Sequence, residues 1–467
     1  MASRALLAPL AALLALLCAP ALGSRAVYHR MLSLSALSRS GVRVGWTSGP
    51  GDVLGAGTST VEYGPSPAAL GARALGYNWT WVDVGNPFGG TNRTYTHHLV
   101  ELPDLRAGAV YYYRCGDPHD GWSAVAAFTA PRDSFPPGAP LTVAVFGDLG
   151  WTNAQALPSL QDAALRGGRG ADLFLSLGDY AYNLDYRDGA VGDAYQSAME
   201  SITATQLCQG AVGNHEVMLS FAHYTHRFRV FVGAAPASGL LPDVPGLLGG
   251  LPNNHWYSFE LGAGTPQGVH FLILSTEAYF YYNASAAQLA FARADLAAVD
   301  RARTPWLVVA GHRSLYCSCD ADCLGDAATV RDGPQGLEAL LLEHKADLWL
   351  NGHEHNAERF YAVRRGAVAT GPSSGAPGGN ASAPEVLVDP AAPVYVVSGC
   401  AGNVEAREPF TLPQPPISAF RSDAYGWARL TVHNASALLL EFVQADAAQP
   451  QPPGTVIDAM LLLRTKR

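Results

Sequence analysis

The sequence predicts two domains: an all-β sandwich of the fibronectin type III or immunoglobulin type, followed by a larger α/β layered domain. Residues 25–132 contain short apolar strands separated by Gly/Pro-rich turns, a pattern typical of sandwiches of about 100 residues. From residue 141 onwards, apolar strands alternate with helical segments, as they do in layered α/β folds. We expect the Pro-rich stretch 133–140 to be the linker and 141–467 to be the second domain.

The strands and helices of each domain are predicted from hydrophobic patterning. Four strands are expected in the first domain, at 42–48, 95–102, 109–115 and 122–130. Six strands are expected in the second, at 141–146, 172–177, 269–275, 305–310, 347–350 and 394–399. Three helices are expected there, at 154–166, 286–302 and 335–345. The stretch 371–393 is rich in Gly, Pro and Ser, so we expect a mobile loop.

Residues 1–23 have the features of a secretory signal. Arg4 precedes a short Ala/Leu-rich core, and Ala21-Leu22-Gly23 has the small residues of a cleavage site. The run is too short and too rich in Ala to favour a membrane span. We expect a secreted protein, with the lysosome as an alternative destination. Five Asn-x-Ser/Thr sites are expected to be glycosylated surface positions: Asn78, Asn92, Asn283, Asn380 and Asn434.

The net charge disfavours one class of partner, and the cysteine content predicts disulfide bonds. A net charge of −9 at pH 7 disfavours nucleic acid as a partner. The cysteines beyond the signal are Cys115, Cys208, Cys317, Cys319, Cys323 and Cys400. Three of them lie in 317-CSCDADC-323, which resembles a zinc loop but lacks a second thiolate pair at finger spacing. We expect a disulfide in this loop, with Cys317 and Cys323 as a candidate pair, and no metal bound by its cysteines.

Polar residues follow five apolar runs of the second domain. They are Asp148, Asp179, the triplet Asn214-His215-Glu216, His312, and the pair His353 and His355. Sites in α/β sheets gather at the carboxyl ends of strands, and residues i and i+2 of an extended chain point to the same side. Two cations about 3.5 to 4 Å apart need a bridging carboxylate and further oxygen or nitrogen ligands. The pattern therefore predicts a two-metal site, with Asp179 as the natural bridge.

These blocks resemble the purple acid phosphatases of the metallophosphoesterase superfamily. The matching motifs are Gly147-Asp148-Leu149-Gly150, Gly178-Asp179-Tyr180-Ala181-Tyr182, Gly213-Asn214-His215-Glu216, His312 and Gly352-His353-Glu354-His355. The resemblance covers nearly the whole chain and is closest to the animal iron/zinc type. It implies that 141–467 is a metallophosphoesterase domain, with a β-sandwich core flanked by helices.

The identity of the metals rests on two positions. Ordinary dimetal phosphoesterases carry Asp-x-His in the first block, whereas Leu149 and Gly150 follow Asp148 here. Tyr182 lies three residues after Asp179, and a phenolate is a hard donor that suits Fe(III). The resemblance implies Fe(III) on Asp148, Asp179, Tyr182 and His355. It implies a divalent cation on Asp179, Asn214, His312 and His353, with zinc favoured and iron or manganese as alternatives.

The reaction that the resemblance implies is hydrolysis of phosphate monoesters at acid pH, by in-line attack of a metal-bound hydroxide. The substrate would be a small phosphomonoester or a phosphoprotein, with His215 binding the phosphate and Glu216 orienting its neighbours. The loop 314–323 lacks the histidine that often protonates the leaving group, so the general acid stays unassigned, with His223 and His226 as candidates. Two alternatives remain: a dimetal phosphodiesterase or nucleotidase, and a secreted binding protein of the same fold without turnover.

Overall fold

The computed structural model describes residues 27–35, 38–48, 58–84, 92–118, 121–165, 171–231, 253–369, 373–374, 382–449 and 451–465. The expected signal at 1–23 and the expected glycosylation site Asn380 lie outside these residues. Of the other four glycosylation sites, Asn92, Asn283 and Asn434 are exposed and Asn78 is partly exposed. Within the described ranges, no helix is long and apolar enough to cross a membrane.

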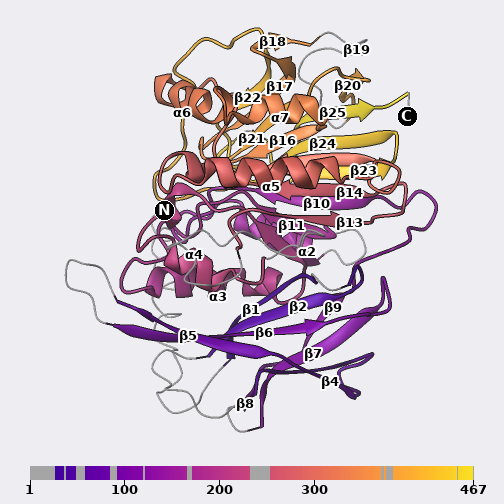
Figure 1. Cartoon of the computed structure of the whole chain (residues 1–467), viewed down its shortest axis with the longest axis vertical. Helices are drawn as coiled ribbons and strands as arrows, with labels where there is room; N and C mark the ends of the chain where they lie inside the picture. Colours follow the sequence, from indigo (N-terminus) through magenta and orange to yellow (C-terminus); the bar gives the residue numbers. More distant parts are fainter. Residues whose placement is uncertain are drawn as a thin grey trace, which may run out of the picture.

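The N-terminal part of the chain is a sandwich of two antiparallel sheets, as expected (Figure 1). One sheet has the order β1-β2-β6-β5, and the other has the order β4-β3-β7-β8 with β9 paired to β7. The strands are β1 (Val27–Leu34), β2 (Val42–Ser48), β3 (Thr60–Gly64), β4 (Ala72–Leu75), β5 (Tyr77–Asp83), β6 (Arg93–Leu102), β7 (Val110–Asp117), β8 (Gly121–Trp122) and β9 (Ala126–Thr129). The strand expected at 122–130 is two short strands, because Ser123 to Val125 leave the sheet between them.

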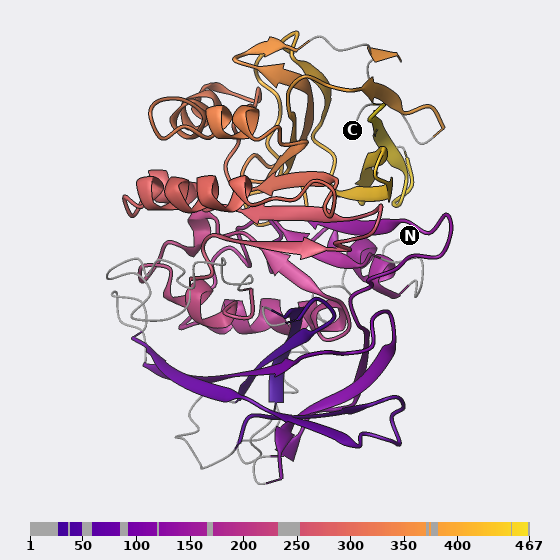
Figure 2. The same ribbon diagram turned by 45° about the vertical axis from the view of Figure 1, so that its right-hand side comes forward.

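The C-terminal part contains two eight-stranded sheets (Figure 2). The first sheet, in spatial order, is β12 (Cys208–Gly210), β11 (Leu173–Ser176), β10 (Leu141–Phe146), β23 (Gly426–Asn434), β24 (Ala437–Gln444), β25 (Val456–Leu463), β20 (Glu385–Val388) and β19 (Ser373–Ser374). The second is β13 (Tyr257–Leu261), β14 (Val269–Ile273), β15 (Trp306–Ala310), β16 (Leu348–Asn351), β21 (Val394–Ser398), β17 (Ala357–Arg364) and β18 (Ala367–Val368), with β22 (Ser418–Ser422) paired to β17.

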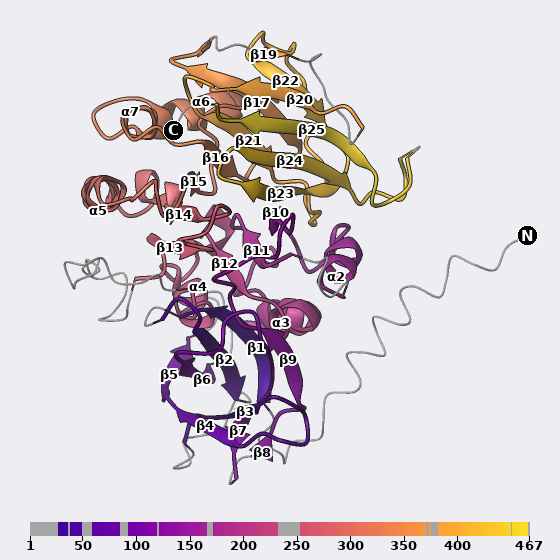
Figure 3. The ribbon, with the colours of Figure 1, turned by 90° about the vertical axis from the view of Figure 1, so that its right-hand side faces the viewer.

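The continuous apolar runs are explained by burial of both faces of the second sheet. In β15, Val308 and Ala310 pack into the core shared with the first sheet. Leu307 and Val309 of the same strand face the opposite way, into a cluster with residues of two helices. These helices, α5 (Ser285–Ala297) and α7 (Leu337–Glu343), lie on the outer side of the second sheet in Figure 3. The sandwich core flanked by helices that the resemblance implied is therefore present.

Four further helices complete this region. They are α2 (Leu157–Leu165), α3 (Ala190–Thr203), α4 (Ala222–Arg227) and α6 (Ala321–Arg331), accompanied by the 3₁₀ turns η1 (Asn214–Glu216) and η2 (Thr276–Tyr279). Helices α2 and α3 cover the outer side of the first sheet near β11 and β12 (Figure 3). Helices α3, α4 and α6 were not expected, and the segment of α6 was interpreted only as a disulfide loop.

The expectation of a loop over the whole of 371–393 is wrong for part of that stretch. Glu385–Val388 form β20, which pairs in parallel with β25 from the end of the chain. This strand was not predicted, because the Gly, Pro and Ser residues around it are typical of a loop. Leu387 is buried in the shared core, so tertiary packing overrides the local composition.

The two domains meet along β1 and α3. Leu32 of β1 forms a bridge with Leu207 just before β12, and Arg30 binds Glu200 of α3 at 2.6 Å. The Tyr113 hydroxyl donates to the carbonyl of Ala204 at 2.8 Å. The sandwich therefore rests on the helical side of the first large sheet.

Candidate metal centre

Five loops at the carboxyl ends of strands bring the predicted residues together. Strands β10, β11 and β12 run parallel in one sheet, as do β14, β15, β16 and β21 in the other. Their carboxyl ends therefore point the same way within each sheet. Backbone hydrogen bonds tie the loops to one another, from Asp148 N to Gly178 O at 3.1 Å and from Gly311 N to Leu350 O at 3.0 Å.

One cluster contains Asp148, Tyr182 and His355. The Tyr182 hydroxyl lies 3.1 Å from Asp148 Oδ1 and 2.7 Å from His355 Nε2. His355 Nε2 is 3.7 Å from the same carboxylate oxygen. Asp148 is fully buried and Tyr182 is 6 % exposed. A carboxylate, a phenol and an imidazole thus converge on one point.

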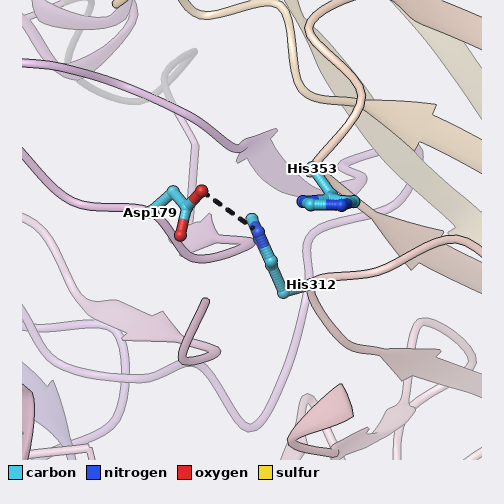
Figure 4. A group of neighbouring side chains, drawn as sticks. All are labelled: Asp179, His312 and His353. Atoms are coloured by element: carbon cyan, nitrogen blue, oxygen red, sulfur yellow. Dashed lines mark ion pairs between the residues drawn. The ribbon is translucent and has the colours of Figure 1, made fainter. Parts of the chain in front are cut away.

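A second cluster contains Asp179, Asn214, His312 and His353. His312 Nε2 lies 3.2 Å from Asp179 Oδ2 and 3.0 Å from Asn214 Oδ1. Ligand atoms of Asp179, His312 and His353 all lie within 4.8 Å of one another. Figure 4 shows how these three side chains converge from separate loops, with the ion pair between Asp179 and His312 marked.

The backbone at these positions is strained. Asp148, Asp179, Tyr182 and His353 have φ values of 61°, 56°, 54° and 72°, in the left-handed region that side chains other than Gly rarely adopt. Such strain concentrates at functional sites, where the surrounding structure holds the conformation. A Cβ at Gly352 would lie 2.3 Å from Asp148 Oδ2. Glycine is therefore required before His353, so that the loop can approach this carboxylate.

Two neighbours orient the cluster residues. His312 Nδ1 is 2.9 Å from the carbonyl oxygen of Leu177, so this nitrogen donates and leaves Nε2 free to face Asp179. The buried carboxylate of Glu216 accepts the backbone N–H groups of Asp179, Tyr180 and Gly213 at 2.8 to 3.0 Å. Glu216 therefore supports the loop that carries Asp179, which agrees with the orienting role expected for it.

The electrostatics show a deeply buried set of negative groups. Burial, together with the charge of Asp179, raises the pKa of Asp148 well above its ordinary value. Burial alone would lower the pKa of His312, but the charge and hydrogen bond of Asp179 raise it to about 10. The charge of Asp179 also raises the pKa of Asp148 and of Tyr182. It therefore influences the titration of residues in both clusters. Burial lowers the pKa of both His353 and His355 to about 4, which keeps these imidazoles neutral as ligands require.

The donor set fits two cations. Hard carboxylate, phenol and amide oxygens lie beside imidazole nitrogens, a combination that binds iron and zinc. The pKa of His312 shows that, without metal, a protonated imidazole compensates the charge of Asp179. Cations bound here would neutralise these buried carboxylates.

His215 lies beside the two clusters. Its backbone N–H donates to Asp179 Oδ1 at 2.8 Å, and its Nδ1 lies 2.5 Å from Asn183 Oδ1. Its ring centroid is 4.2 Å from that of Tyr182, and Nε2 is 3.5 Å from Glu405 Oε1. The side chain lines a pocket of about 370 Å³ that opens over the centre.

The two histidines that were considered as general acids do not lie at this pocket. His223 Nε2 is 3.2 Å from Asp83 Oδ2 of the sandwich. His226 stacks on Trp81 with centroids 4.6 Å apart. Both belong to α4, which packs against β5, so they are part of the domain interface. Their assignment as general-acid candidates is therefore wrong.

Several residues at the centre were missed from the sequence. Asn183 holds His215, Glu405 faces it, and Arg313 Nη1 lies 2.9 Å from His353 Nε2. Asp326 Oδ2 is 3.3 Å from the same nitrogen. Asn183 and Arg313 directly follow predicted ligands in the chain, which is a usable signal. Glu405 and Asp326 lie on segments without a motif.

The cysteine loop lies against this pocket. Cys317 and Cys323 form a disulfide, which confirms the expected pair. Cys319 is a buried free thiol whose Sγ lies 3.3 Å from Glu354 Oε2. Burial and the charge of the neighbouring Glu408 raise the pKa of Glu354 to about 8.

Comparisons with known proteins agree with the fold and the site. Residues 141–357 match the calcineurin-like phosphoesterase family. Residues 27–130 match the purple acid phosphatase N-terminal domain, and residues 392–458 match the C-terminal region of iron/zinc purple acid phosphatase-like proteins. Fold and centre together define a metallophosphoesterase.

Individual similar proteins indicate the family within the metallophosphoesterases. Acid phosphatase type 7 of Danio rerio is 36% identical over 430 residues, which cover 87% of this chain and 86% of the relative. The human protein of the same name is 33% identical, with 87% and 85% covered. A solved purple acid phosphatase from yellow lupin (Lupinus luteus) seeds superposes with a TM-score of 0.69 at 22% identity, over 94% of this chain and 75% of the lupin chain.

The chain belongs to the purple acid phosphatase family. It is accordingly a phosphatase, and the family implies a dimetal centre in it.

Proposed function

We propose that the chain is a secreted acid phosphatase that hydrolyses phosphate monoesters at a centre of Fe(III) and a divalent cation, with zinc favoured over iron or manganese. The proposed ligands of the iron are Asp148, Asp179, Tyr182 and His355. Those of the divalent cation are Asp179, Asn214, His312 and His353. When bound, such a pair of cations supplies Lewis acidity, because it lowers the pKa of water and neutralises charge on phosphoryl oxygens.

One observation carries this proposal. The phenol of Tyr182 lies within 3.1 Å of both Asp148 Oδ1 and His355 Nε2. A tyrosine donor distinguishes a ferric centre from the divalent pairs of ordinary dimetal phosphoesterases. The alternatives of a phosphodiesterase or nucleotidase would instead be favoured by a histidine where Gly150 stands.

The residues around the centre suit a phosphate ester. His215 is held beside the two clusters by Asn183 and by the backbone contact with Asp179, which supports the proposal that its ring binds the phosphate group of the substrate. The pocket is rich in carboxylates: Asp179, Asp320, Asp322, Asp326, Glu354, Glu405 and Glu408. Since they repel a phosphate dianion when ionised, cations bound among them would offset that repulsion.

Location and domain boundaries belong to the same proposal. A signal at 1–23, a sandwich at 25–132, a linker at 133–140 and a catalytic domain at 141–467 are supported by the family matches that begin at residues 27 and 141. The exposed Asn92, Asn283 and Asn434 support glycosylation along the secretory route. A small phosphomonoester or a phosphoprotein is the proposed substrate.

The test combines metal analysis, the visible spectrum and a pH profile of the purified protein. We expect iron with a second metal, a phenolate-to-iron charge-transfer band, and faster hydrolysis of p-nitrophenyl phosphate than of bis(p-nitrophenyl) phosphate. Tyr182→Phe should lose the band, whereas Tyr186→Phe, an exposed tyrosine near the same loop, should keep it. Iron-loaded protein without a band would refute the Tyr182 assignment, and preference for the diester would favour the phosphodiesterase alternative.

A further inference from the structure

A second group of potential ligands lies beside the dimetal centre but uses other side chains. Ligand atoms of Cys319, Glu354 and Glu408 all lie within 4.8 Å of one another. Glu354 stands between His353 and His355 in a bent segment, in which His353 has a φ of 72°. The Cys319 Sγ lies 3.3 Å from Glu354 Oε2. The two groups of ligands thus share the short segment 353–355.

One of the two carboxylate oxygens of Glu354 has no hydrogen-bond donor within the described part of the chain. Glu354 is only 4 % exposed, and its Oε1 is buried without a hydrogen-bond partner among the described residues. Buried carboxylate oxygens are normally hydrogen-bonded or bound to a cation. Here the neighbouring acidic residue is Glu408, so charge repulsion adds to the cost of burial. The cluster therefore has the charge and the open acceptor of a cation site.

The donor types indicate which cation. A thiolate with two carboxylates suits a borderline-soft divalent ion such as zinc, rather than calcium or magnesium. Tetrahedral zinc with Zn–S of about 2.3 Å and Zn–O of about 2.1 Å separates sulfur from oxygen by about 3.6 Å. The 3.3 Å between Cys319 Sγ and Glu354 Oε2 is close to this separation.

We propose that Cys319, Glu354 and Glu408 bind a zinc-type divalent cation, as a third site separate from the dimetal centre. This departs from the expectation, based on spacing alone, that no cysteine of 317–323 is a ligand. Cys317 and Cys323 remain outside the site because they are joined in the disulfide. The proposal does not depend on the phosphatase reaction.

The site would link three segments around the pocket. Glu408 Oε2 accepts the backbone N–H of His355 at 3.0 Å, and Glu408 N donates to His355 O at 3.2 Å. The carbonyl oxygen of Cys319 accepts the N–H of Thr411 at 2.8 Å. A cation on Cys319, Glu354 and Glu408 would therefore fasten the disulfide loop and the segment 403–412 to the loop that carries His353 and His355.

The experiment is a cadmium titration of the full-length, metal-loaded protein. Cadmium bound to a thiolate gives an ultraviolet charge-transfer band, and the proposed ligands of the dimetal centre include no thiol. We expect a band that saturates at one cadmium per chain and is suppressed by zinc. Cys319→Ser should abolish it, whereas Cys115→Ser, a buried cysteine of the sandwich, should retain it.

Glu408→Gln provides a second variant, in which the thiol is intact and the band persists. We expect its cadmium affinity to fall by about tenfold or more, as for loss of a ligand or its close support. No band in wild-type protein would overturn the proposal, and so would an undiminished band in Cys319→Ser. An unchanged affinity in Glu408→Gln would remove Glu408 from the site.

Discussion

The metal centre and the domain interface are both built around buried histidines, but the neighbours of those histidines differ. At the centre, His312 contacts the Asp179 carboxylate and the Asn214 amide. At the interface, His226 stacks on Trp81 with centroids 4.6 Å apart and accepts a hydrogen bond from Trp79 Nε1 at 3.2 Å. Several carboxylate, phenol and amide donors around imidazoles suit cations at the centre, whereas at the interface indole rings pack against His226.

The largest expected effect separates the two regions by activity. His355→Ala removes a nitrogen donor from the cluster of Asp148 and Tyr182. We expect it to lower iron content and colour and to reduce kcat/KM by at least about a hundredfold, since support residues alone cost up to that much. His353→Ala should lower chiefly the divalent metal, with a similar loss of activity. Metal analysis and a phosphomonoester assay measure both effects.

The matched control is His226→Ala at the interface. It should keep its metals and stay within about twofold of wild-type kcat/KM, because it removes no donor from the centre. Near-wild-type activity in His353→Ala or His355→Ala, with unchanged metal content, would return these residues to the role of surface histidines. A large loss in His226→Ala would show that the interface is coupled to the centre.

The next effect concerns the support of the centre. Glu216→Gln replaces an acceptor of three backbone N–H groups by an amide with one acceptor oxygen. We expect metal affinity to fall by about 10- to 100-fold and the free energy of unfolding to fall by about 1–3 kcal/mol. Competition with a chelator and urea unfolding measure these changes. Glu343→Gln, on a carboxylate that is 55% exposed, is the control and should change neither.

A smaller effect is the pH dependence of stability, which differs between the histidines of the interface and those of the centre. Burial lowers the pKa of His29 at the interface to about 4, whereas its value in the unfolded chain is about 6.5. The unfolded state alone binds the proton between these values, so stability falls as pH decreases from about 6.5 to about 4. For His29 the loss is about 2 kcal/mol at pH 4.5. In metal-free protein, the raised pKa of His312 has the opposite sign: its stabilisation is present below pH 6.5 and is lost as pH rises through about 10.

Urea unfolding at pH 7 and pH 4.5 tests this contrast. His29→Gln should reduce the difference in unfolding free energy between the two pH values, while the same change at the exposed His433 should leave it unaltered. An equal pH dependence in wild type and His29→Gln would show that the interface histidine does not resist protonation.

The smallest expected effect is on packing. Trp81 and the ring of His226 are stacked at 4.6 Å with an interplanar angle of 3°. His226→Ala should lower the free energy of unfolding by about 1 kcal/mol through loss of this stacking. Thermal or urea unfolding of the metal-loaded protein measures it, and an unchanged stability would mean that the stacked pair contributes no net energy.

The elements that could be predicted are those whose signal is local. Strands β10, β11, β14, β15, β16 and β21 were found because apolar runs of four to seven residues with β-branched side chains indicate buried strands without further context. Strand β20 was missed because its partner β25 lies 75 residues further on, as in the pair Glu385 and Met460. The core of the domain is shared between its two sheets. Pairing between strands so far apart in the chain cannot be recognised from a short stretch of sequence.

By itself, the sequence determined the donor types and their positions at strand ends. Asp148, Asp179, Asn214, His312, His353 and His355 could be singled out because each follows an apolar run, and Tyr182 because of its spacing from Asp179. The pairing of Cys317 with Cys323 was also a candidate, because the expected secretory route makes disulfides the default.

Only the tertiary structure decided which histidines share an environment with these donors. His215 and His226 both follow polar or small residues in short helical segments, yet one lies against Tyr182 and the other against Trp81. The same holds for Glu354, Glu408 and Cys319, which come from separate segments of the chain and meet at the pocket that Glu354 and Glu408 line. The function of an imidazole, a carboxylate or a thiol depends on the charges and donors within a few ångströms. Those neighbours come from distant parts of the chain, brought together when the two sheets and the sandwich pack.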